Sequence, residues 1–517
     1  MKYQINDFKI SPKDDYKLED IIKEKFKLNK FNYKIIQKSI DARNKLDIKI
    51  IYKLMIDTDK LIKGKNVSIY KDEKIELTYP NWNHLRPIIV GFGPAGMFAA
   101  LYLARCGAKP IIIERGSDID ARKKDVDEFL KNKKLNLNSN VQFGEGGAGA
   151  FSDGKLTTNL KDPLIKFILN EFYIHGAKED ILYESKPHIG TDYLAKIVKN
   201  IRLEIIKLGG TFYFNHQFID AKKIDSDIIE VNVLGLDKIK TNHLLLGLGH
   251  SARDTIKHLY NDMHIKMQQK AFSMGVRVEH PRELIDYAQY GDFYKYLPSA
   301  YYKLSYHNND RGIYSFCMCP GGYVLASTSD ENSIVTNGMS NNDRANFNSN
   351  SAILVDVKPS DYNNGNVLDG IYYQEKYEKL AFLLSKDYKA PANLFKEFLN
   401  DEVAKDIRSV KTTYPHGIYF IDLSKCLPNY VIDGIKTGIL EFDKKMKGFN
   451  YDDAILIGIE SRSSSPVRIL RDDNLESSIK GIYPMGEGAG YAGGITSAAL
   501  DGIKVAMKIA KGEIKWI

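Results

Sequence analysis

The stretch "RPIIVGFGPAGMFAALYLARCGAKPIIIERG", residues 86–116, decides the fold. Its opening run, "RPIIV", is apolar without alternation, which is typical of a strand buried on both faces of a parallel sheet. A helix is expected over residues 94–106, because Pro94 suits a first helical position and Gly107 suits the position just past a helix end. The run "KPIIIERG" predicts a second buried strand. Strand, helix and strand in this order predict a βαβ unit and an α/β fold.

Between the first strand and the helix, "GFGPAG" has the G-x-G-x-x-G pattern of a dinucleotide-binding turn. Gly91 allows the tight turn, Gly93 lets a pyrophosphate approach the backbone, and Gly96 lets the helix pack against the strand. The helix N-terminus, with Pro94 and Ala95, faces the phosphates. The alternative is a chance glycine-rich turn in an α/β sheet that binds nothing.

The second strand ends at Glu114, eighteen residues beyond Gly96. A carboxylate at this point can accept hydrogen bonds from both hydroxyls of an adenosine ribose. Because the side chain is acidic and not basic, we expect no 2′-phosphate at this site. The neighbouring Arg115 is counted among the expected cofactor-binding residues.

Composition excludes several classes of protein. The length of 517 residues predicts about two to four domains. The net charge of +8 is spread along the chain without a clustered basic stripe, which argues against a nucleic-acid partner. Four cysteines suit a reducing compartment, and the N-terminus lacks an apolar signal core. The apolar run from Pro87 to Ala104 contains turn residues, so we expect no membrane span and a cytoplasmic protein.

Two further stretches are rich in glycine. The loop "FGEGGAGAFSDGKL" contains Gly146 and Gly147, whose amides are expected to line a bound cofactor, although a plain flexible loop is the alternative. The stretch "LLLGLGHSARDT", residues 244–255, fits G-x-G-x-x-A and could be a second dinucleotide site, for NAD(P)H. We favour a strand that returns to the first sheet, with Gly249 near the cofactor. The reason is that no second strand with an acidic residue follows at the right distance.

Near the end of the chain, "GEGAGYAGG" at 486–494 has five glycines in nine residues, just before a helical stretch. With these motifs the chain resembles the bacterial family of uncharacterised FAD-dependent dehydrogenases, which have an FAD domain of the glutathione-reductase type. The resemblance spans about residues 88 to 503. It is carried by "VGFGPAGMFAAL", "ERG", "QFGEGGAGAFSDGKL", "KPHIGTD", "LGLGHSARDT", "FCMCPGG", "SSSPVRI" and "YPMGEGAGYAGGITSAALDG".

The resemblance implies that the cofactor is FAD and that the first glycine-rich turn and Glu114 bind its ADP half. It also implies that the late glycines lie against the ribityl chain and the isoalloxazine ring, whose flat shape would be blocked by side chains. The residues placed there are Gly486, Glu487, Gly493, Gly494 and Ile495. Related flavoproteins usually carry Gly-Asp where this chain has Gly-Glu.

The expected architecture is a Rossmann-like FAD-binding domain, discontinuous in sequence, with an inserted α+β domain and a small N-terminal α+β domain. The N-terminal domain covers residues 1–84, with a helix at "LEDIIKEKFKL" and a helix or loop, then a strand, in "IIQKSIDARNKLDIKIIYKLMI". The FAD-binding domain covers residues 85–255 and 450–517. The inserted domain covers residues 256–449, and the strand "DDAILIGIE" is assigned to the second FAD segment.

Candidates for catalysis are fewer. Cys317 and Cys319 in "FCMCPGG" could be a redox pair, because a disulfide across one residue is strained and easily reduced. We favour two packed free thiols, and we expect no metal site because other ligands are lacking. His188 is a candidate acid or base, although such loop histidines commonly position a turn. Arg462 could bind an anionic substrate, or form only a surface salt bridge.

We therefore expect an FAD-dependent oxidoreductase, a dehydrogenase in which flavin N5 exchanges a hydride with a small-molecule substrate. The substrate would lie between the FAD-binding and inserted domains, and an unidentified electron acceptor or donor would complete the cycle. One alternative is an NAD(P)H-dependent flavoprotein reductase that uses residues 244–255. Another is a flavin-dependent RNA-binding or RNA-modifying protein with residues 1–84 as its binding module.

Overall fold

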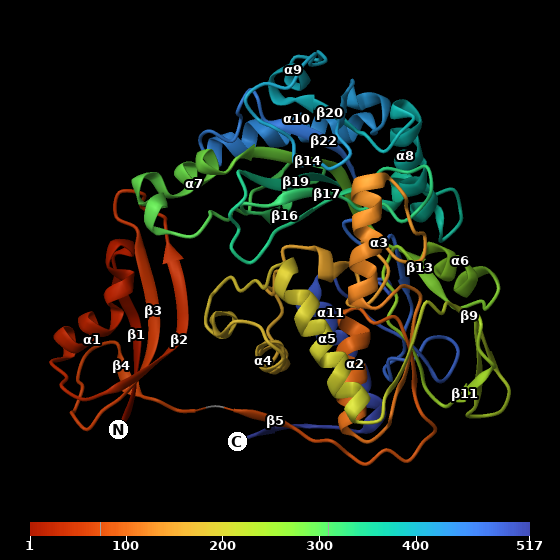
Figure 1. Ribbon diagram of the computed structural model, residues 1–517, viewed down its shortest axis with the longest axis horizontal. Coiled ribbons are helices and arrows are strands. Elements are labelled where there is room, and N and C mark those ends of the chain that lie inside the picture. Colours follow the sequence, from red (N-terminus) through yellow and green to blue (C-terminus); the bar gives the residue numbers. More distant parts are fainter. Residues whose placement is uncertain (73, 309) are drawn as a thin grey trace.

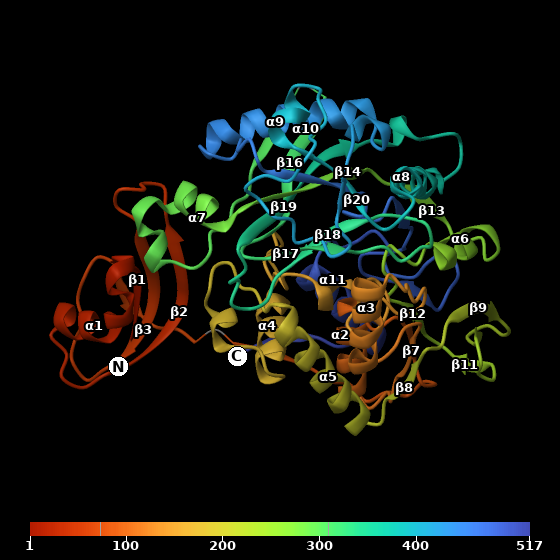
Figure 2. The ribbon, with the colours of Figure 1, turned by 45° about the horizontal axis from the view of Figure 1, so that its top comes forward.

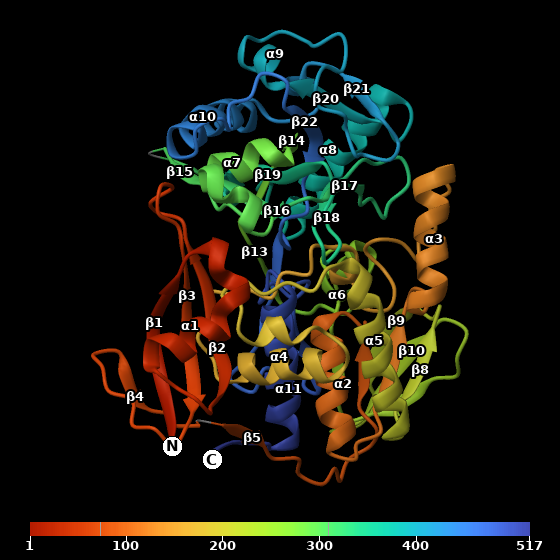
Figure 3. The same cartoon turned by 60° about the vertical axis from the view of Figure 1, so that its left-hand side comes forward.

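The computed structural model describes residues 1–72, 74–308 and 310–517. They form three units, which Figure 1 shows as an N-terminal lobe, a unit around a parallel sheet and a unit around a larger sheet. In Figure 3 the larger sheet lies above the parallel-sheet unit, and the N-terminal lobe stands beside the parallel-sheet unit, below the level of the larger sheet. The fold is therefore mixed α/β.

The parallel sheet is built from widely separated parts of the sequence. Its order is β24-β12-β6-β7-β8, and every neighbouring pair is parallel. The strands are β6 (Ile88–Val90), β7 (Ile111–Glu114), β8 (Thr211–Phe214), β12 (Leu244–Leu246) and β24 (Ile482–Pro484). The expected strand, helix and strand are confirmed, with α2 (Pro94–Arg105) between β6 and β7. The favoured interpretation of residues 244–255 is also confirmed, because β12 pairs with β6.

Helices α2 and α11 (Ile495–Ala510) pack unusually closely. A Cβ added at Gly502 would lie 2.1 Å from the carbonyl oxygen of Ala95, so backbone meets backbone where the helices cross. The side chains of α2 are buried from Ala95 to Ala104, which explains why this stretch is so apolar. Among the described residues, no helix has both the length and the apolar character needed to cross a membrane.

The larger sheet has the order β15-β16-β19-β14-β22-β20-β21. Figure 2 shows α10 (Asn429–Lys445) lying over this sheet. The strands are β14 (Phe272–Pro281), β15 (Ser305–His307), β16 (Gly312–Cys319), β19 (Asn348–Val357), β20 (Ala390–Leu394), β21 (Ile418–Phe420) and β22 (Ile455–Glu460).

Strand β22 corrects the expected domain boundary at residue 450. It was assigned to the FAD-binding segment, but it pairs antiparallel with β14 and β20 in the larger sheet. All six of its residues are buried, and a continuous apolar run does not indicate which sheet a strand joins. The segment that returns to the parallel sheet therefore begins after Glu460.

The N-terminal lobe has a sheet of order β2-β3-β1-β4 with α1 (Leu18–Phe26) packed against it. Its strands are β1 (Lys2–Ile10), β2 (Asn32–Asp41), β3 (Lys49–Asp57) and β4 (Val67–Ile69). The expected helix or loop around residues 35–41 was wrong, because β2 pairs antiparallel with β3 along this length. As an edge strand β2 has no fully buried side chain, so its sequence lacks a clear apolar alternation.

The remaining elements connect these units. The last strand, β25 (Ile514–Trp516), pairs antiparallel with β5 (Ile75–Leu77), which follows the N-terminal lobe. The other helices are α3 (Ile119–Asn132), α4 (Leu164–Ile174), α5 (Thr191–Lys207), α6 (Arg253–Asn261), α7 (Arg282–Tyr290), α8 (Asp369–Ser385) and α9 (Phe395–Leu399). The other strands are β9 (Phe218–Lys223), β10 (Ile229–Val233), β11 (Ile239–Thr241), β13 (Met267–Gln269), β17 (Tyr323–Ala326), β18 (Thr336–Met339) and β23 (Val467–Ile469).

The helix crossing leads to a first prediction. Gly502→Ala should lower the free energy of unfolding by about 1–3 kcal/mol, because the new methyl group has no room against Ala95. Intrinsic helix propensity alone would favour alanine by up to about 1 kcal/mol, so the sign of the change is diagnostic. The measurement is urea unfolding of the cofactor-free protein. Gly493→Ala is the control, since its Cβ would meet nothing within 4 Å; equal stability of the two variants would contradict the packing described.

Candidate functional site

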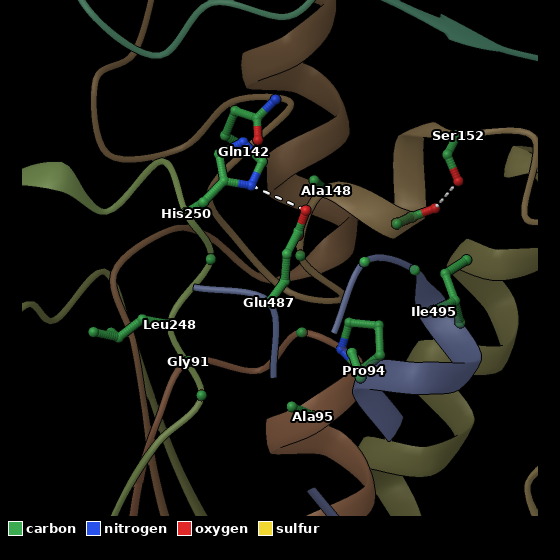
Figure 4. A pocket seen from close by; sticks show the side chains of 18 of the residues that line it. Gly91, Pro94, Ala95, Gln142, Ala148, Ser152, Leu248, His250, Glu487 and Ile495 are labelled. Atoms are coloured by element: carbon green, nitrogen blue, oxygen red, sulfur yellow. Dashed lines mark hydrogen bonds and ion pairs between the residues drawn. The ribbon is translucent and has the colours of Figure 1, made fainter. Parts of the chain in front are cut away.

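A cavity of about 550 Å³ lies between the parallel-sheet unit and the larger-sheet unit. Its floor is formed by the turns that follow β6, β7 and β12 and by the N-termini of α2 and α11 (Figure 4). The larger-sheet unit contributes the opposite wall, including Tyr301, Lys303, Phe316 and Cys317. Cavities of this size commonly hold small molecules and cofactors.

Glu114 is fixed at one end of the cavity by the backbone. Its Oε2 accepts a hydrogen bond from the Phe92 amide at 2.8 Å, and its Oε1 accepts from the amides of Gly116 and Gly144 at 3.0 Å each. The side chain is 5% exposed. The three amides leave one of the roughly four acceptor sites of the carboxylate free, so the group can still receive one hydroxyl of a ribose and not both. The geometry therefore fits the adenosine half of a dinucleotide.

The glycines of the first turn have different roles. Gly91 has a φ of +89°, and a Cβ there would lie 2.6 Å from the carbonyl oxygen of Gly247. A Cβ at Gly96 would lie 1.9 Å from the Gly91 oxygen, so Gly96 permits packing beneath the cavity and does not line it. Gly93 lines the cavity together with Gly147 of the second glycine-rich loop, and Pro94 and Ala95 also line it.

At the other end, the cavity is lined by Glu487, Gly493, Gly494 and Ile495. A Cβ at either glycine would meet nothing within 4 Å, so the space over this backbone is open. This open cradle before the N-terminus of α11 fits a flat ring. Gly486 does not line the cavity; its amide donates to Asp501 Oδ2 at 2.7 Å and supports the turn.

Of two further residues expected to bind the cofactor, Arg115 lines the cavity and Gly146 does not. Arg115 donates to Asp254 Oδ1 at 2.8 Å and to Thr255 Oγ1 at 2.9 Å, and its guanidinium lies 4.6 Å from the Phe143 ring centroid. These contacts fix Arg115 beside Glu114. Gly146 lies next to Val198 and outside the residues that line the cavity.

His250 is a cavity residue that the sequence analysis missed. Its Nδ1 lies 3.1 Å from Glu487 Oε1 (Figure 4), while its buried Nε2 has no hydrogen-bond partner among the described residues. A buried polar atom without a partner on a cavity wall fits a site that a polar ligand completes. The motif "GLGHSARDT" contained this signal next to Gly249, which lines the cavity as well. The Glu487 carboxylate therefore faces both the cavity and the imidazole ring of His250.

Arg462 lines the cavity, but its guanidinium is already bonded inside the protein. It donates to Glu378 Oε2 at 2.7 Å, to Asp330 Oδ2 at 2.5 Å and to hydroxyls of two serines. Glu378 is 1% exposed and also pairs with Arg253 at 2.7 Å, and these two guanidinium groups hold its pKa well below its usual range. The structure thus makes Arg462 part of a buried ion-pair network that joins α6, α8 and the chain after β22, and not a surface salt bridge.

His188 does not line the cavity, although it forms a β-bridge with Lys155, which does. Its Nε2 is 3.0 Å from the carbonyl oxygen of Asn342, and burial together with the nearby Arg344 lowers its pKa. This contact joins the loop before α5 to the larger-sheet unit. A role for His188 as acid or base stays a prediction.

Cys317 and Cys319 lie at the end of β16, and Cys317 lines the cavity. The Arg277 guanidinium donates to the Cys317 carbonyl oxygen and lies 3.6 Å from Cys319 Sγ. A hydrogen bond from Cys319, with Lys155 and Arg277 nearby, lowers the pKa of Cys317, whereas burial raises the pKa of Cys319. Lys155 and Arg277 were missed because their partners are far away in the sequence.

Comparisons with known proteins point to the same cofactor. A family model described as "FAD-dependent protein, C-terminal domain-like" matches residues 271–463. A Clostridium beijerinckii protein described as "Uncharacterized protein" is 47% identical over 527 residues, which covers 98% of each chain. Together with the fit of the cavity, the match to this family model shows that FAD is the cofactor.

Solved structures resemble the chain only weakly. CtdE in complex with FAD is 11% identical, with a TM-score of 0.32 over 82% of this chain and 84% of that chain. Halogenase PltM is 11% identical, with a TM-score of 0.37 over 83% of this chain and 68% of that chain. Similarity at this level supports no inference about the reaction.

The environment of Glu114 leads to a prediction about affinity. Glu114→Gln should weaken FAD binding by about 1.5–3 kcal/mol, roughly tenfold to more than a hundredfold in Kd, because a charged acceptor is lost. The measurement is titration of the cofactor-free protein with FAD, followed by flavin fluorescence. Glu230→Gln is the matched control, since Glu230 forms only a surface ion pair with Lys238. Unchanged affinity in Glu114→Gln would show that the ribose does not contact this carboxylate.

The thiols lead to a prediction about pH. Cys317 should react with iodoacetamide with an inflection well below the ~8.5 of a free cysteine, because its lowered pKa leaves the reactive thiolate populated at lower pH. Cys106 and Cys426 are internal controls, since burial raises their pKa to about 11 and about 12. Mass spectrometry of the labelled peptides gives the rates. An inflection for Cys317 at or above that of a free thiol would contradict the assigned environment.

Proposed function

The chain belongs to the same family as its Clostridium beijerinckii relative, and because FAD is the cofactor we propose that it is an oxidoreductase acting on a small molecule. When bound, FAD supplies hydride transfer at its N5 atom. The supporting observation is that one cavity is lined both by the cofactor-binding turns and by the larger-sheet unit. A substrate bound against that second wall would face the flavin ring.

The wall opposite the cofactor turns favours an anionic substrate. Lys155 and Lys303 both line the cavity, and the Lys155 ammonium lies 5.0 Å from the Tyr301 ring centroid. Ser315 and Asn337 add hydrogen-bonding groups to the same wall. Ammonium groups beside an aromatic ring and polar side chains suit a carboxylate attached to an apolar body.

The buried ion-pair network positions the two walls of this site and does not itself contact the substrate. Arg253 belongs to the parallel-sheet unit, whereas Glu378 lies on α8 of the larger-sheet unit, and Arg462 bonds to the same carboxylate. Both guanidinium groups are almost fully buried. The network would hold the two walls at a constant separation and keep water out of the junction behind the cavity.

The NAD(P)H-dependent alternative predicted a separate dinucleotide site at residues 244–255, but within the described part of the chain these residues do not form a separate cavity. Gly247, Leu248, Gly249 and His250 line the same cavity as the first glycine-rich turn. A nicotinamide would therefore have to approach the flavin from the substrate side. The RNA-binding alternative, with residues 1–84 as the module, stays an untested prediction.

Two measurements test the proposed function. The flavin released by heating should be identified as FAD by chromatography, and the bound flavin should bleach anaerobically with a member of a panel of small carboxylates. Stopped-flow mixing with NADH and NADPH provides the comparison for the reductase alternative. Fast bleaching by a nicotinamide, with none by any carboxylate, would favour that alternative over the dehydrogenase.

Lys303→Ala tests the expected charge of the substrate. It should raise the concentration of carboxylate needed for half-maximal bleaching about two- to fivefold, the effect of losing a partly exposed ionic contact. Lys23→Ala, at an exposed position of α1, is the matched control. The same shift with an uncharged amide of the substrate would contradict a charge interaction at Lys303.

A further inference from the structure

A β-bulge in β16 brings Cys317 and Cys319 together. The proposed hydride transfer assigns no role to these two thiols. Phe316 pairs with Ala352 and Cys319 pairs with Asn350, so three steps along β16 span two steps along β19. Cys317 has a φ of +44°, which is uncommon for a residue other than glycine. Such local strain is typical of functional positions.

Contacts place Cys317 at the flavin-ring end of the cavity. The ammonium group of Lys155 donates to the carbonyl oxygen of Met318, the residue between the two cysteines. The next residue, Leu156, accepts a hydrogen bond at its carbonyl oxygen from Thr496 Oγ1 at 2.8 Å. Thr496 belongs to the first turn of α11, whose N-terminus follows the open glycine cradle. The edge strand β24 leads to this cradle. Glu114 lies on β7, which is separated from β24 by the two strands β12 and β6.

The two sulfur atoms differ in access and charge. Cys317 is partly accessible from the cavity, while Cys319 is fully buried behind it. Arg277 and Lys155 are the cations beside the pair, and Arg277 is itself held by Glu460 at 2.8 Å. A partly accessible thiol with a lowered pKa next to a buried thiol with a raised pKa is the arrangement that forms a disulfide when an oxidant accepts two electrons.

We propose that Cys317 and Cys319 form a second redox centre, a dithiol–disulfide pair that exchanges two electrons with the bound FAD. In the forward direction the Cys317 thiolate and the Cys319 thiol lose two electrons and one proton, and an S–S bond forms. Oxidised FAD takes up both electrons and the proton and becomes the reduced anionic flavin. This inference rests on FAD binding in the cavity and is independent of the substrate.

The amount of reductant consumed tests the proposal directly. In an anaerobic dithionite titration, the air-oxidised FAD-bound protein should take up four electrons per FAD, two for the flavin and two for the disulfide. Cys319→Ser and Cys317→Ser should each take up two. Cys106→Ala is the control and should match the unsubstituted protein, because Cys106 is buried at the end of α2. Uptake of only two electrons by the unsubstituted protein would overturn the proposal, whatever the variants do.

A second readout does not use the flavin signal. After air oxidation, the denatured protein should carry no iodoacetamide label on Cys317 or Cys319, and their peptide should be two hydrogens lighter than after reduction. Full labelling of both residues after air oxidation in the presence of FAD would overturn the proposal.

Lys155 should tune the pair without being part of it. Lys155→Met should move the alkylation inflection of Cys317 to higher pH, because a cation that stabilises the thiolate is lost. The electron count should stay at four. Lys303→Met is the matched control, since it removes another ammonium group of the cavity that does not contact the cysteine strand through Met318. An unchanged inflection in Lys155→Met would overturn the electrostatic part of the argument.

Discussion

Backbone packed directly on backbone is the constraint on which the cofactor site depends. The Gly91 turn touches the backbone at Gly247, Gly96 fits under Gly91, and α11 crosses α2 at Gly502. Any side chain at these points would push β6, β12 and α11 apart. Since the cavity floor consists of the turns that leave these elements, its shape follows from contacts that contain no side chain at all.

Above this floor, buried ion pairs join the two units. Glu378 is buried between Arg253 and Arg462. The junction between the two units therefore depends on a desolvated carboxylate that is paired with both guanidinium groups. Such pairs add little net stability compared with apolar packing, but breaking one leaves an uncompensated buried charge. The network therefore specifies one arrangement of the two units. Strand β22 places Arg462 correctly because it is fixed in the larger sheet between β14 and β20.

The sequence predicted correctly those elements whose residue pattern lies within one short stretch of the chain. The βαβ unit, its glycines and Glu114 lie within thirty-one residues, and the buried strands and helix ends there are visible in the sequence. The assignment of β22 failed because an apolar run does not identify its partner strands. His250, Lys155 and Arg277 were missed for a similar reason, since each acquires its role from residues at least forty positions away. The pairing of Arg462 with Glu378 likewise required the fold.

The late position of β24 and α11 has a consequence for biosynthesis. The edge of the parallel sheet and the open glycine cradle of the cavity come from residues 482–510, long after the first glycine-rich turn has left the ribosome. Until then β12 has an unpaired edge, which is a surface prone to wrong pairing. Because β24 and α11 are among the last elements to be synthesised, this edge stays open until nearly the whole chain has left the ribosome, and the cavity floor can close only then.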